Sequence, residues 1–398
     1  MSQKKVGIIT FYHNSENYGG LLQAYALVYK IKKLGYECEQ ISYEGSNLPN
    51  LFIDKIVTKG VMKKIILIVP KKVKNFALNL KDKQKIKSIQ SGLQLRSEAF
   101  ENFRLNRIPH SKTYNQKTIN NSVANYDIFV CGSDQIWNPI WTDNSYYLDF
   151  VPSNKIKISY AASFGVNQLS PLESKDISKI INRIDRISVR ESEGKEILKE
   201  EFGLNAELVL DPTLLLKKQE WDALAEEVPI NYKYMFVYLL GDSIKHRKLI
   251  KKYAIKLNLK IVYLPHIFSK YCRNDENFAD TDLYDVGPEK FISLIKNADI
   301  IITDSFHGCV FSIIYEKKFW ALKRHADEHA STMNSRLYSL FSLLGIKERI
   351  ISEEKLTIEP KLFNNEIDYI QCKKVLSICR EQSLTYLKEI DTVVNFSI

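Results

Sequence analysis

The sequence predicts an α/β fold with two domains. Short apolar runs with strand character alternate with longer runs of helical periodicity, and this alternation is typical of parallel sheets covered by helices. One run, residues 300–303, is rich in β-branched side chains, as buried parallel strands are. At 398 residues the chain is long enough for two ordinary domains. We expect an N-terminal domain over residues 1–217, a second domain over 218–350 and a helical extension over 351–398.

The beginning of the chain predicts a βαβ unit. Its elements are strands over 6–11 and 38–43, a polar loop over 14–20 and a helix over 21–34. The loop lacks the G-x-G-x-x-G spacing of a dinucleotide site, so no nicotinamide cofactor is predicted. Gly19 and Gly20 fit turn formation and a ligand-facing role equally well.

Four later strands end in small, polar or charged residues. These strands cover 126–131, 156–160, 187–189 and 208–210, and they run into Gly132, Ala161, Arg190 and Asp211. In open parallel sheets, ligands bind at the carboxyl edge of the strands. Any one ending could be simple turn chemistry, and for residues 211–213 we favour a helix cap. The recurrence predicts a ligand-binding edge.

The second half of the chain also alternates between strand patterns and helix patterns. Strands are expected over 234–240, 259–264, 300–303 and 319–322, and helices over 243–257, 288–297, 337–344 and 373–390. There is no internal repeat and no low-complexity linker, so the two domains should join tightly.

The strand-to-helix turn around His307 is the strongest single site signal. Asp304 and Ser305 are favoured N-cap residues, and Gly308 lets another group approach the backbone closely. Free N–H groups at a helix start suit phosphate or carboxylate, and an imidazole there can move protons near neutral pH. A buried histidine that satisfies a turn carbonyl is the alternative, and this pattern alone does not separate the two.

The positive charge is concentrated in one segment. The net charge is +10, and residues 51–90 hold eleven Lys against Asp54 and Asp82. Aliphatic residues interleave with these lysines, as on a basic amphipathic helix. The segment has no Arg and only two aromatic residues, which argues against a nucleic-acid partner. We expect a basic helical insertion over about 51–110, either solvated or in contact with an anionic membrane surface.

The cysteines and apolar runs indicate a cytoplasmic protein. The six Cys form no CxxC pair and have no His at metal-ligand spacing, so we expect reduced thiols and no metal. The N-terminal residues lead straight into a strand pattern, and the apolar run over 65–69 is too short to cross a bilayer. Any peripheral contact should be with the inner face of the plasma membrane.

Six motifs in sequence order carry a resemblance to a known family. They read NYGGLLQAY, GSDQIWN, YAASFG, SVRE, DPT and TDSFHG, and begin at Asn17, Gly132, Tyr160, Ser188, Asp211 and Thr303. Through them the chain resembles the polysaccharide pyruvyl transferase family over roughly residues 6–345. The resemblance implies two Rossmann-like domains facing across a cleft, a GT-B-like arrangement, with the C-terminal extension packing back on the first domain.

The resemblance also implies a reaction. Phosphoenolpyruvate would be the donor and co-substrate, with no separate cofactor. A sugar or lipid-linked oligosaccharide would be the acceptor, and pyruvate would become a cyclic ketal on two of its hydroxyls. Such ketals belong to exopolysaccharide, capsular or other cell-surface polysaccharide biosynthesis.

That chemistry suggests roles for individual residues. The donor carries a carboxylate and a phosphate, so it needs fixed cations and N–H groups, and each step of ketal formation moves a proton. Expected catalytic residues are His307, Asp304 and Asp134. Expected donor-binding residues are Ser305, Phe306, Gly308, Arg190, Arg336 and Arg324. Expected acceptor-binding residues are Asn17, Gly19, Gly20, Ser133, Gln135, Trp137 and Ser163.

One motif departs from the family pattern. Better-studied relatives carry Arg-Leu-His where this chain has Ser305-Phe306-His307. The histidine is retained and the arginine is not, so Arg190, Arg324 or Arg336 must supply the missing cation.

Two other functions remain open at this point. A nucleotide-sugar glycosyltransferase with the same architecture would be stabilised by uridine or guanosine nucleotides and not by phosphoenolpyruvate. A non-catalytic sugar- or polyanion-binding protein would bind polyanions in a salt-sensitive way without turnover.

Overall fold

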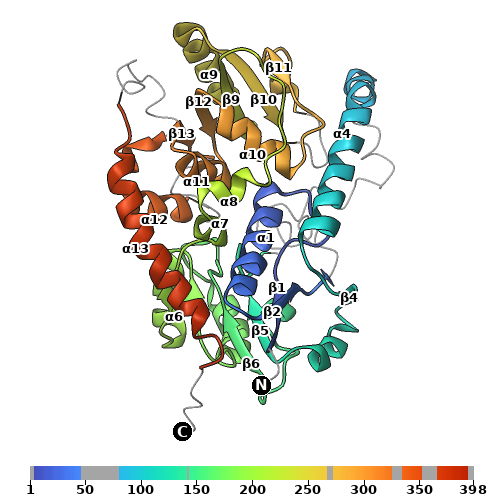
Figure 1. Ribbon diagram of the computed structural model, residues 1–398, viewed down its shortest axis with the longest axis vertical. Coiled ribbons are helices and arrows are strands. Elements are labelled where there is room, and N and C mark those ends of the chain that lie inside the picture. The colour runs from blue at the N-terminus through green and yellow to red at the C-terminus, as the bar shows by residue number, and fades with distance from the viewer. Residues whose placement is uncertain are drawn as a thin grey trace.

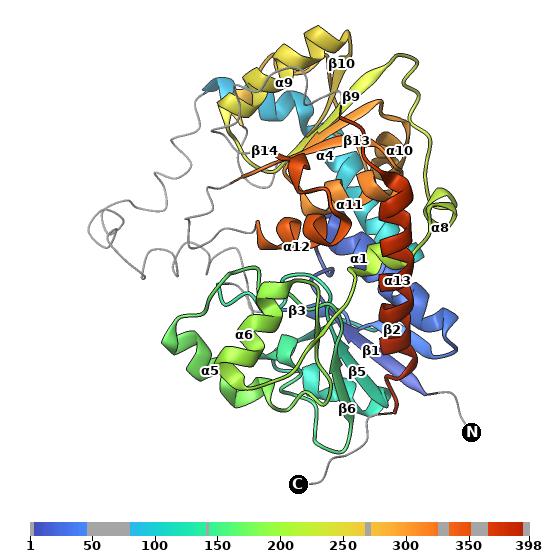
Figure 2. The same cartoon turned by 90° about the vertical axis from the view of Figure 1, so that its left-hand side faces the viewer.

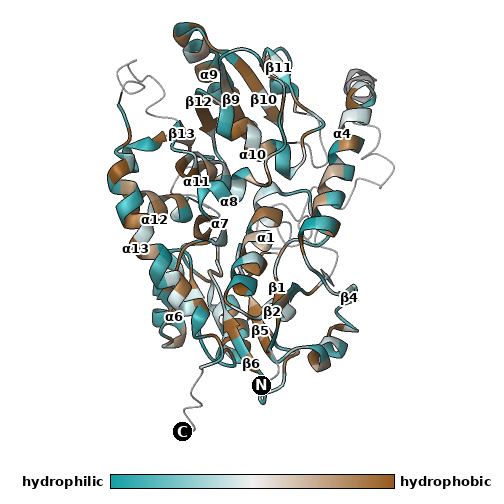
Figure 3. Cartoon of the chain, in the orientation of Figure 1, coloured by the Kyte–Doolittle hydropathy of each residue, from teal (hydrophilic) through white to brown (hydrophobic). Residues whose placement is uncertain are grey.

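The computed structural model describes residues 4–45, 80–140, 143–266, 272–324, 334–351 and 365–392. It contains two main parallel sheets, one in each half of the chain, with helices packed around them (Figure 1). Strands such as β9 and β10 are hydrophobic along their length, whereas helix α13 also carries hydrophilic residues (Figure 3). The predicted α/β class is confirmed.

Three strands of the N-terminal sheet end side by side at the same edge. Its strand order is β2-β1-β5-β6, and all pairs are parallel. The strands are β1 (Lys5–Ile9), β2 (Glu37–Gln40), β5 (Ile128–Cys131) and β6 (Ile156–Ser159). Ile9 lies beside Cys131, and Cys131 lies beside Ser159. The segments that follow these strands therefore begin at the same edge of the sheet.

Shorter elements complete this half of the chain. Isolated bridges join β6 to the parallel pair β7 (Ser188–Val189) and β8 (Glu207–Leu208). The other elements are α1 (Tyr18–Lys33), β3 (Tyr43–Glu44), α4 (Leu80–Arg107), β4 (Tyr114–Asn115), η2 (Ile119–Asn125), η3 (Asn144–Tyr147), α5 (Pro171–Ile181), α6 (Ser192–Phe202), α7 (Pro212–Leu215) and α8 (Lys218–Asp222).

The C-terminal sheet has strand order β11-β10-β9-β12-β13-β14 and is also parallel. Its strands are β9 (Tyr234–Leu239), β10 (Lys260–Pro265), β11 (Thr281–Asp282), β12 (Ile300–Thr303), β13 (Lys318–Leu322) and β14 (Ile350–Ile351). The helices are α9 (Ile244–Leu257), η4 (Arg273–Asp275), α10 (Pro288–Asn297), α11 (Phe306–Ile314), α12 (Ser335–Leu344), η5 (Lys347–Arg349) and α13 (Tyr369–Lys388). The central strand β12 is buried on both faces, which explains its β-branched sequence.

Helix α13 runs along both halves of the molecule (Figures 1 and 2). Its Tyr386 hydroxyl donates a hydrogen bond to the Ser159 carbonyl at 2.8 Å, and Ser383 Oγ accepts one from Leu210 N at 3.0 Å. Near its start, Tyr369 donates to the Lys317 carbonyl in the C-terminal half. The closing helix thus ties the ends of two N-terminal strands to the second sheet.

Helix α1 starts earlier than the sequence pattern indicates. Asn17 caps it by accepting a hydrogen bond from Gly20 N at 3.1 Å, so Gly19 and Gly20 lie in its first turn and not in a loop. Tyr18 anchors this turn to the C-terminal half: its ring stacks on Phe291 at 4.6 Å and its hydroxyl donates to the Val286 carbonyl. The start of α1 therefore lies between the two domains and contacts the C-terminal one.

Most of the predicted basic insertion, residues 46–79, lies outside the described residues. Helix α4 follows it and contains the C-terminal part of the predicted insertion. Within the described ranges, no helix is long and apolar enough to cross a membrane.

Candidate functional site

The N-termini of two helices meet between the domains. Asn17 caps α1, and Ser305 caps α11 by accepting a hydrogen bond from Gly308 N at 3.3 Å. A Cβ on Gly19 would lie 1.9 Å from Nδ1 of His307, so only glycine lets the ring come this close. The imidazole is buried, with 6% of the residue exposed. The resulting contact joins the α1 turn to the TDSFHG turn.

Asp211 faces the other side of the His307 ring. Its Oδ2 lies 3.6 Å from His307 Nε2 and accepts a hydrogen bond from Arg190 Nη1 at 2.9 Å. Its Oδ1 accepts hydrogen bonds from Thr213 N and Oγ1 at 3.0 and 2.6 Å, which caps α7. Burial alone would raise the pKa of Asp211, but His307 and Arg190 outweigh it and hold the pKa well below its usual range.

Arg190 links two carboxylates at the centre of the site. Besides Asp211, it donates a hydrogen bond to Asp134 Oδ1 at 2.9 Å, and only 1% of its side chain is exposed. Asp134 has a left-handed backbone conformation with φ 73°, which few non-glycine residues adopt. Burial opposes ionisation of Asp134, yet Arg190 and His307 lower its pKa. Both carboxylates are therefore held as anions.

Arg336 is a half-buried cation that makes no ion pair in the described part of the chain, although Asp134 and Glu191 lie near enough to raise its pKa. Its guanidinium lies 5.5 Å from the centre of the Phe306 ring, which Arg190 also contacts at 4.9 Å. Its Nε has no hydrogen-bond partner among the described residues. Burial and the neighbouring Arg190 lower the pKa of Arg336 to about 10. A half-buried arginine without an ion pair favours binding of an anion.

Glu191 is a buried carboxyl group beside these arginines. One oxygen lies 3.6 Å from Arg190 Nε, and neither oxygen has a hydrogen-bond partner among the described residues. Burial raises the pKa of Glu191, with Arg190 opposing the effect. Sequence reasoning missed both Glu191 and the ion pairing of Asp211, although each lies inside a quoted motif. We call Asp134, Arg190, Glu191, Asp211, His307 and Arg336 the central cluster.

Several predicted residues surround the central cluster through backbone contacts. Ser133 Oγ donates to the Ala161 carbonyl at 3.0 Å and lies 3.4 Å from Asp211. Ser163 N donates to the Asp134 carbonyl at 3.0 Å. Gln23, which the sequence reasoning did not single out, accepts a hydrogen bond from Ser133 N and donates one to the Gly20 carbonyl. It thereby fixes the GSDQ turn to the start of α1.

Other predicted residues have structural contacts. Asp304 accepts hydrogen bonds from Leu240 N and Gly241 N at 2.7 and 2.8 Å, which favours a role in holding the end of β9. Trp137 is fully buried and stacks on Tyr147.

Two further predicted residues, Gly308 and Gln135, lie at close contacts that only a glycine permits. A Cβ on Gly308 would lie 2.6 Å from Thr303 Oγ1, so this glycine allows α11 to pack on the end of its own strand. Gln135 lies against Gly165, where a Cβ would be 2.0 Å from its Nε2.

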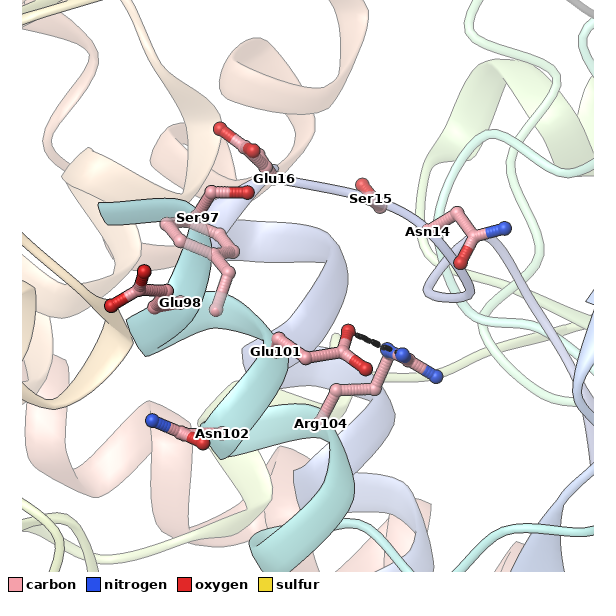
Figure 4. Close-up of a pocket in the computed structure, with 9 residues that line it drawn as sticks. Asn14, Ser15, Glu16, Ser97, Glu98, Glu101, Asn102 and Arg104 are labelled. Atoms are coloured by element: carbon pink, nitrogen blue, oxygen red, sulfur yellow. Dashed lines mark hydrogen bonds and ion pairs between the residues drawn. The ribbon is translucent and has the colours of Figure 1, made fainter. Parts of the chain in front are cut away.

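A polar pocket lies beside the start of α1 (Figure 4). Its volume is about 640 Å³, and its lining comes from the segment before α1 and from α4. The lining residues are Asn14, Ser15, Glu16, Ser97, Glu98, Phe100, Glu101, Asn102 and Arg104. In the described residues, no group of three or more His, Cys, Asp or Glu is placed to hold a metal ion.

Comparison with known proteins gives one family match. The sequence profile of the polysaccharide pyruvyl transferase family matches residues 17–325. No curated protein matches the chain.

Solved structures share the fold at low identity. The chain is similar to a putative UDP-N-acetylglucosamine 2-epimerase from Listeria monocytogenes, with a TM-score of 0.57, 10% identity, and coverage of 99% of this chain and 98% of that chain. It is also similar to S. aureus MnaA in a co-structure with UDP, with a TM-score of 0.51, 12% identity and 98% coverage of both chains. These similarities and the two parallel sheets confirm the predicted GT-B-like pair of Rossmann-like domains.

Proposed function

The chain belongs to the polysaccharide pyruvyl transferase family, and from that premise we propose a specific reaction. The protein transfers the enolpyruvyl unit of phosphoenolpyruvate to two hydroxyls of a sugar, which forms a cyclic ketal and releases phosphate. The acceptor belongs to a cell-surface or capsular polysaccharide, or to its precursor.

The unpaired Arg336 is the observation that most supports this donor. Phosphoenolpyruvate carries two anionic groups, and Arg190 and Arg336 both lie over the Phe306 ring beside His307. Arg190 is already neutralised by Asp134 and Asp211, whereas Arg336 makes no ion pair with a described carboxylate. We assign the role of the missing Arg in the Ser305-Phe306-His307 motif to Arg336.

The reaction requires both a proton donor and a proton acceptor. A proton must reach C3 of the donor while a sugar oxygen bonds to C2; the C2–O bond to phosphate then breaks and a second hydroxyl closes the ring. The diol loses two protons, of which the methyl group and the phosphate each gain one. General acid–base groups at such steps typically contribute about 100- to 10,000-fold in rate.

Two buried groups in the central cluster fit these roles. His307 takes the hydroxyl proton, and the Asp211 carboxylate at 3.6 Å stabilises the resulting imidazolium. We assign the proton transfer to C3 to Glu191, because burial raises the pKa of Glu191 whereas the pKa values of Asp134 and Asp211 are lowered. Arg336 neutralises the departing phosphate.

Phosphate release in the presence of phosphoenolpyruvate and candidate acceptor sugars tests the proposal. His307→Asn keeps hydrogen-bonding capacity but cannot take the proton, so turnover should fall about 100- to 10,000-fold at an unchanged melting temperature. His110→Asn is the matched control, since the His110 ring forms a hydrogen bond with the Ile108 carbonyl in the N-terminal half and is not part of the central cluster. Near wild-type turnover in His307→Asn would contradict the role of the imidazole.

We further propose that the enzyme acts at the inner membrane surface on membrane-linked acceptors. The eleven lysines of residues 51–90, interleaved with aliphatic side chains, support this location. Each Lys near an anionic leaflet contributes about 1 kcal/mol of binding free energy. Flotation with anionic but not neutral liposomes is expected, and equal recovery with both would refute it.

A further inference from the structure

Helix α12 of the C-terminal half packs against helix α6 of the N-terminal half (Figure 2). Both helices adjoin the central cluster. Arg336 lies in the first turn of α12, and Arg190 and Glu191 immediately precede α6. The contact between the two helices therefore affects where the Arg336 cation lies relative to Arg190 and Glu191.

The first turn of α6 has no side-chain cap from its own segment. Glu191 is the N-cap residue by position, but its side chain makes no capping hydrogen bond. The first N–H groups of a helix have no partner inside the helix and need an acceptor. Ser339 of α12 supplies one, because its Oγ accepts a hydrogen bond from Ser192 N at 3.2 Å. A residue of the C-terminal half thus caps a helix of the N-terminal half.

The same hydroxyl also binds the acidic residue of that turn. Ser339 Oγ donates a hydrogen bond to Glu193 Oε2 at 3.0 Å. Ser192 Oγ lies 3.1 Å from this carboxylate oxygen and 2.9 Å from Ser339 Oγ. Hydrogen bonds to an ionised group are roughly twice as strong as those between neutral groups. Because Ser339 accepts from one residue of the turn and donates to the next, it fixes α12 on α6 through two separate bonds.

Ser339 and Arg336 lie on the same face of α12. They are three residues apart, and residues at this spacing are neighbours on a helix surface. No ion pair within the described residues fixes the Arg336 cation: Arg190 lowers its pKa, whereas Asp134 and Glu191 act in the opposite sense. The attachment of α12 to α6 is therefore what keeps Arg336 close to the N-terminal part of the proposed donor site.

We propose that Ser339 is a positioning residue, which holds Arg336 at the donor phosphate by joining α12 to the first turn of α6. This inference rests on the proposed function, because it names the residue that places the donor cation of that reaction. Ser339 does not itself contact the donor and acts through Arg336. Loss of its hydroxyl should therefore weaken donor binding by part of what loss of the Arg336 charge would cost.

Ser339→Ala removes the hydroxyl and suits a helix, since alanine is the best helix former. Phosphoenolpyruvate should bind this variant about 3- to 10-fold more weakly by calorimetry, which is what one or two hydrogen bonds can supply. KM for phosphoenolpyruvate should rise by a similar factor while KM for the acceptor sugar stays constant, whereas a purely structural role would change both or neither. Ser342→Ala, at an exposed position of the same helix, is the matched control and should behave as the wild type.

A double-mutant cycle tests whether Ser339 acts through Arg336. Two residues that act through the same group have effects that do not add. Ser339→Ala should weaken donor binding in the wild-type background and should cause no further loss in Arg336→Met. Equal donor affinity of Ser339→Ala and the wild type, or the full loss repeated in the Arg336→Met background, would overturn the inference.

Labelling with phenylglyoxal gives a readout that needs no donor. This reagent modifies arginine side chains, and peptide mass spectrometry reports the rate at Arg336. Arg336 should react faster in Ser339→Ala than in the wild type or Ser342→Ala, while the half-exposed Arg107 serves as an internal reference with a constant rate. An unchanged rate at Arg336 would overturn the role of Ser339, whereas a wild type that does not bind phosphoenolpyruvate would refute the proposed function and leave the labelling result to decide on Ser339.

Discussion

Replacing Gly19 with Ala should impair catalysis without unfolding the protein. A Cβ at this position would lie 1.9 Å from His307 Nδ1, 2.4 Å from Cγ and 2.6 Å from Cε1. Ordinary contact begins near 3.4 Å, so the ring and the helix must separate by about 1.5 Å. The α1 backbone itself tolerates the change, because Gly19 is helical and Ala is the better helix former by about 1 kcal/mol.

The expected loss follows from this displacement. Moving a reacting group by about 1 Å can cost roughly 100-fold in rate, so kcat should fall by about that factor or more. Binding of phosphoenolpyruvate should change little, since the three atoms nearest to the added Cβ all belong to His307 and not to Arg190 or Arg336. The assay is phosphate release, together with calorimetric donor binding and a thermal melt of the same preparation.

Gly194→Ala is the matched control in helix α6. The nearest atom to a Cβ there would be 3.5 Å away, which is ordinary contact, so activity should be retained. A Gly19→Ala variant that melts normally and keeps the wild-type kcat would refute the reasoning. It would mean that the His307 ring position does not govern the reaction.

Three further substitutions test the central cluster. Asp211→Asn should destabilise the fold by about 3–5 kcal/mol, since it leaves buried basic groups uncompensated, as measured by urea unfolding. The pKa of Asp211 is depressed in the folded state, so its contribution to the free energy of unfolding is complete above the unfolded pKa of about 3.9 and is lost as pH falls below that value. The difference in unfolding free energy between wild type and Asp211→Asn should therefore be constant from about pH 5 to 8 and become smaller only in acid. Glu191→Gln should reduce kcat about 100- to 10,000-fold. The pKa of Glu191 is raised in the folded protein, so ionisation of this carboxyl group lowers stability as pH rises through the folded pKa. Glu191→Gln should therefore be at least as stable as the wild type at neutral pH. A lower melting temperature of the variant would indicate a structural role instead. Arg336→Met should weaken phosphoenolpyruvate binding about 10- to 100-fold by calorimetry at an unchanged melting temperature, and unchanged affinity would remove Arg336 from the donor site.

The positions of the site segments could be predicted from the sequence because strand endings are local signals. Residues after β5, β6 and β12 were expected at a ligand-binding edge, and the structure brings Asp134, Ser163 and His307 together near Arg190 and Asp211. Parallel register explains why Asp134 and Ser163 lie together, since the neighbouring strands β5 and β6 end at the same edge. His307 comes from the other sheet, and its contact with Gly19 shows that packing between the two halves brings it to the site.

The pairing of charges could not be predicted in the same way. Asp211 was read as a helix cap, and its Oδ1 does cap α7, but its Oδ2 pairs with Arg190 and His307 from other parts of the chain. That Arg336 makes no ion pair within the described residues is likewise a property of the assembled fold. Trp137 shows the opposite case: it lies in a polar motif, yet tertiary packing places it in the core against Tyr147.

The most direct test of the central claim is product analysis after reaction in deuterium oxide. Phosphoenolpyruvate and candidate acceptor sugars are incubated with the enzyme, and the sugars are examined by mass spectrometry and NMR. We predict a cyclic ketal whose methyl group carries one solvent deuteron, with one phosphate released per ketal. An open enolpyruvyl ether that retains its methylene, or transfer of sugar from a nucleotide donor without any use of phosphoenolpyruvate, would contradict the account.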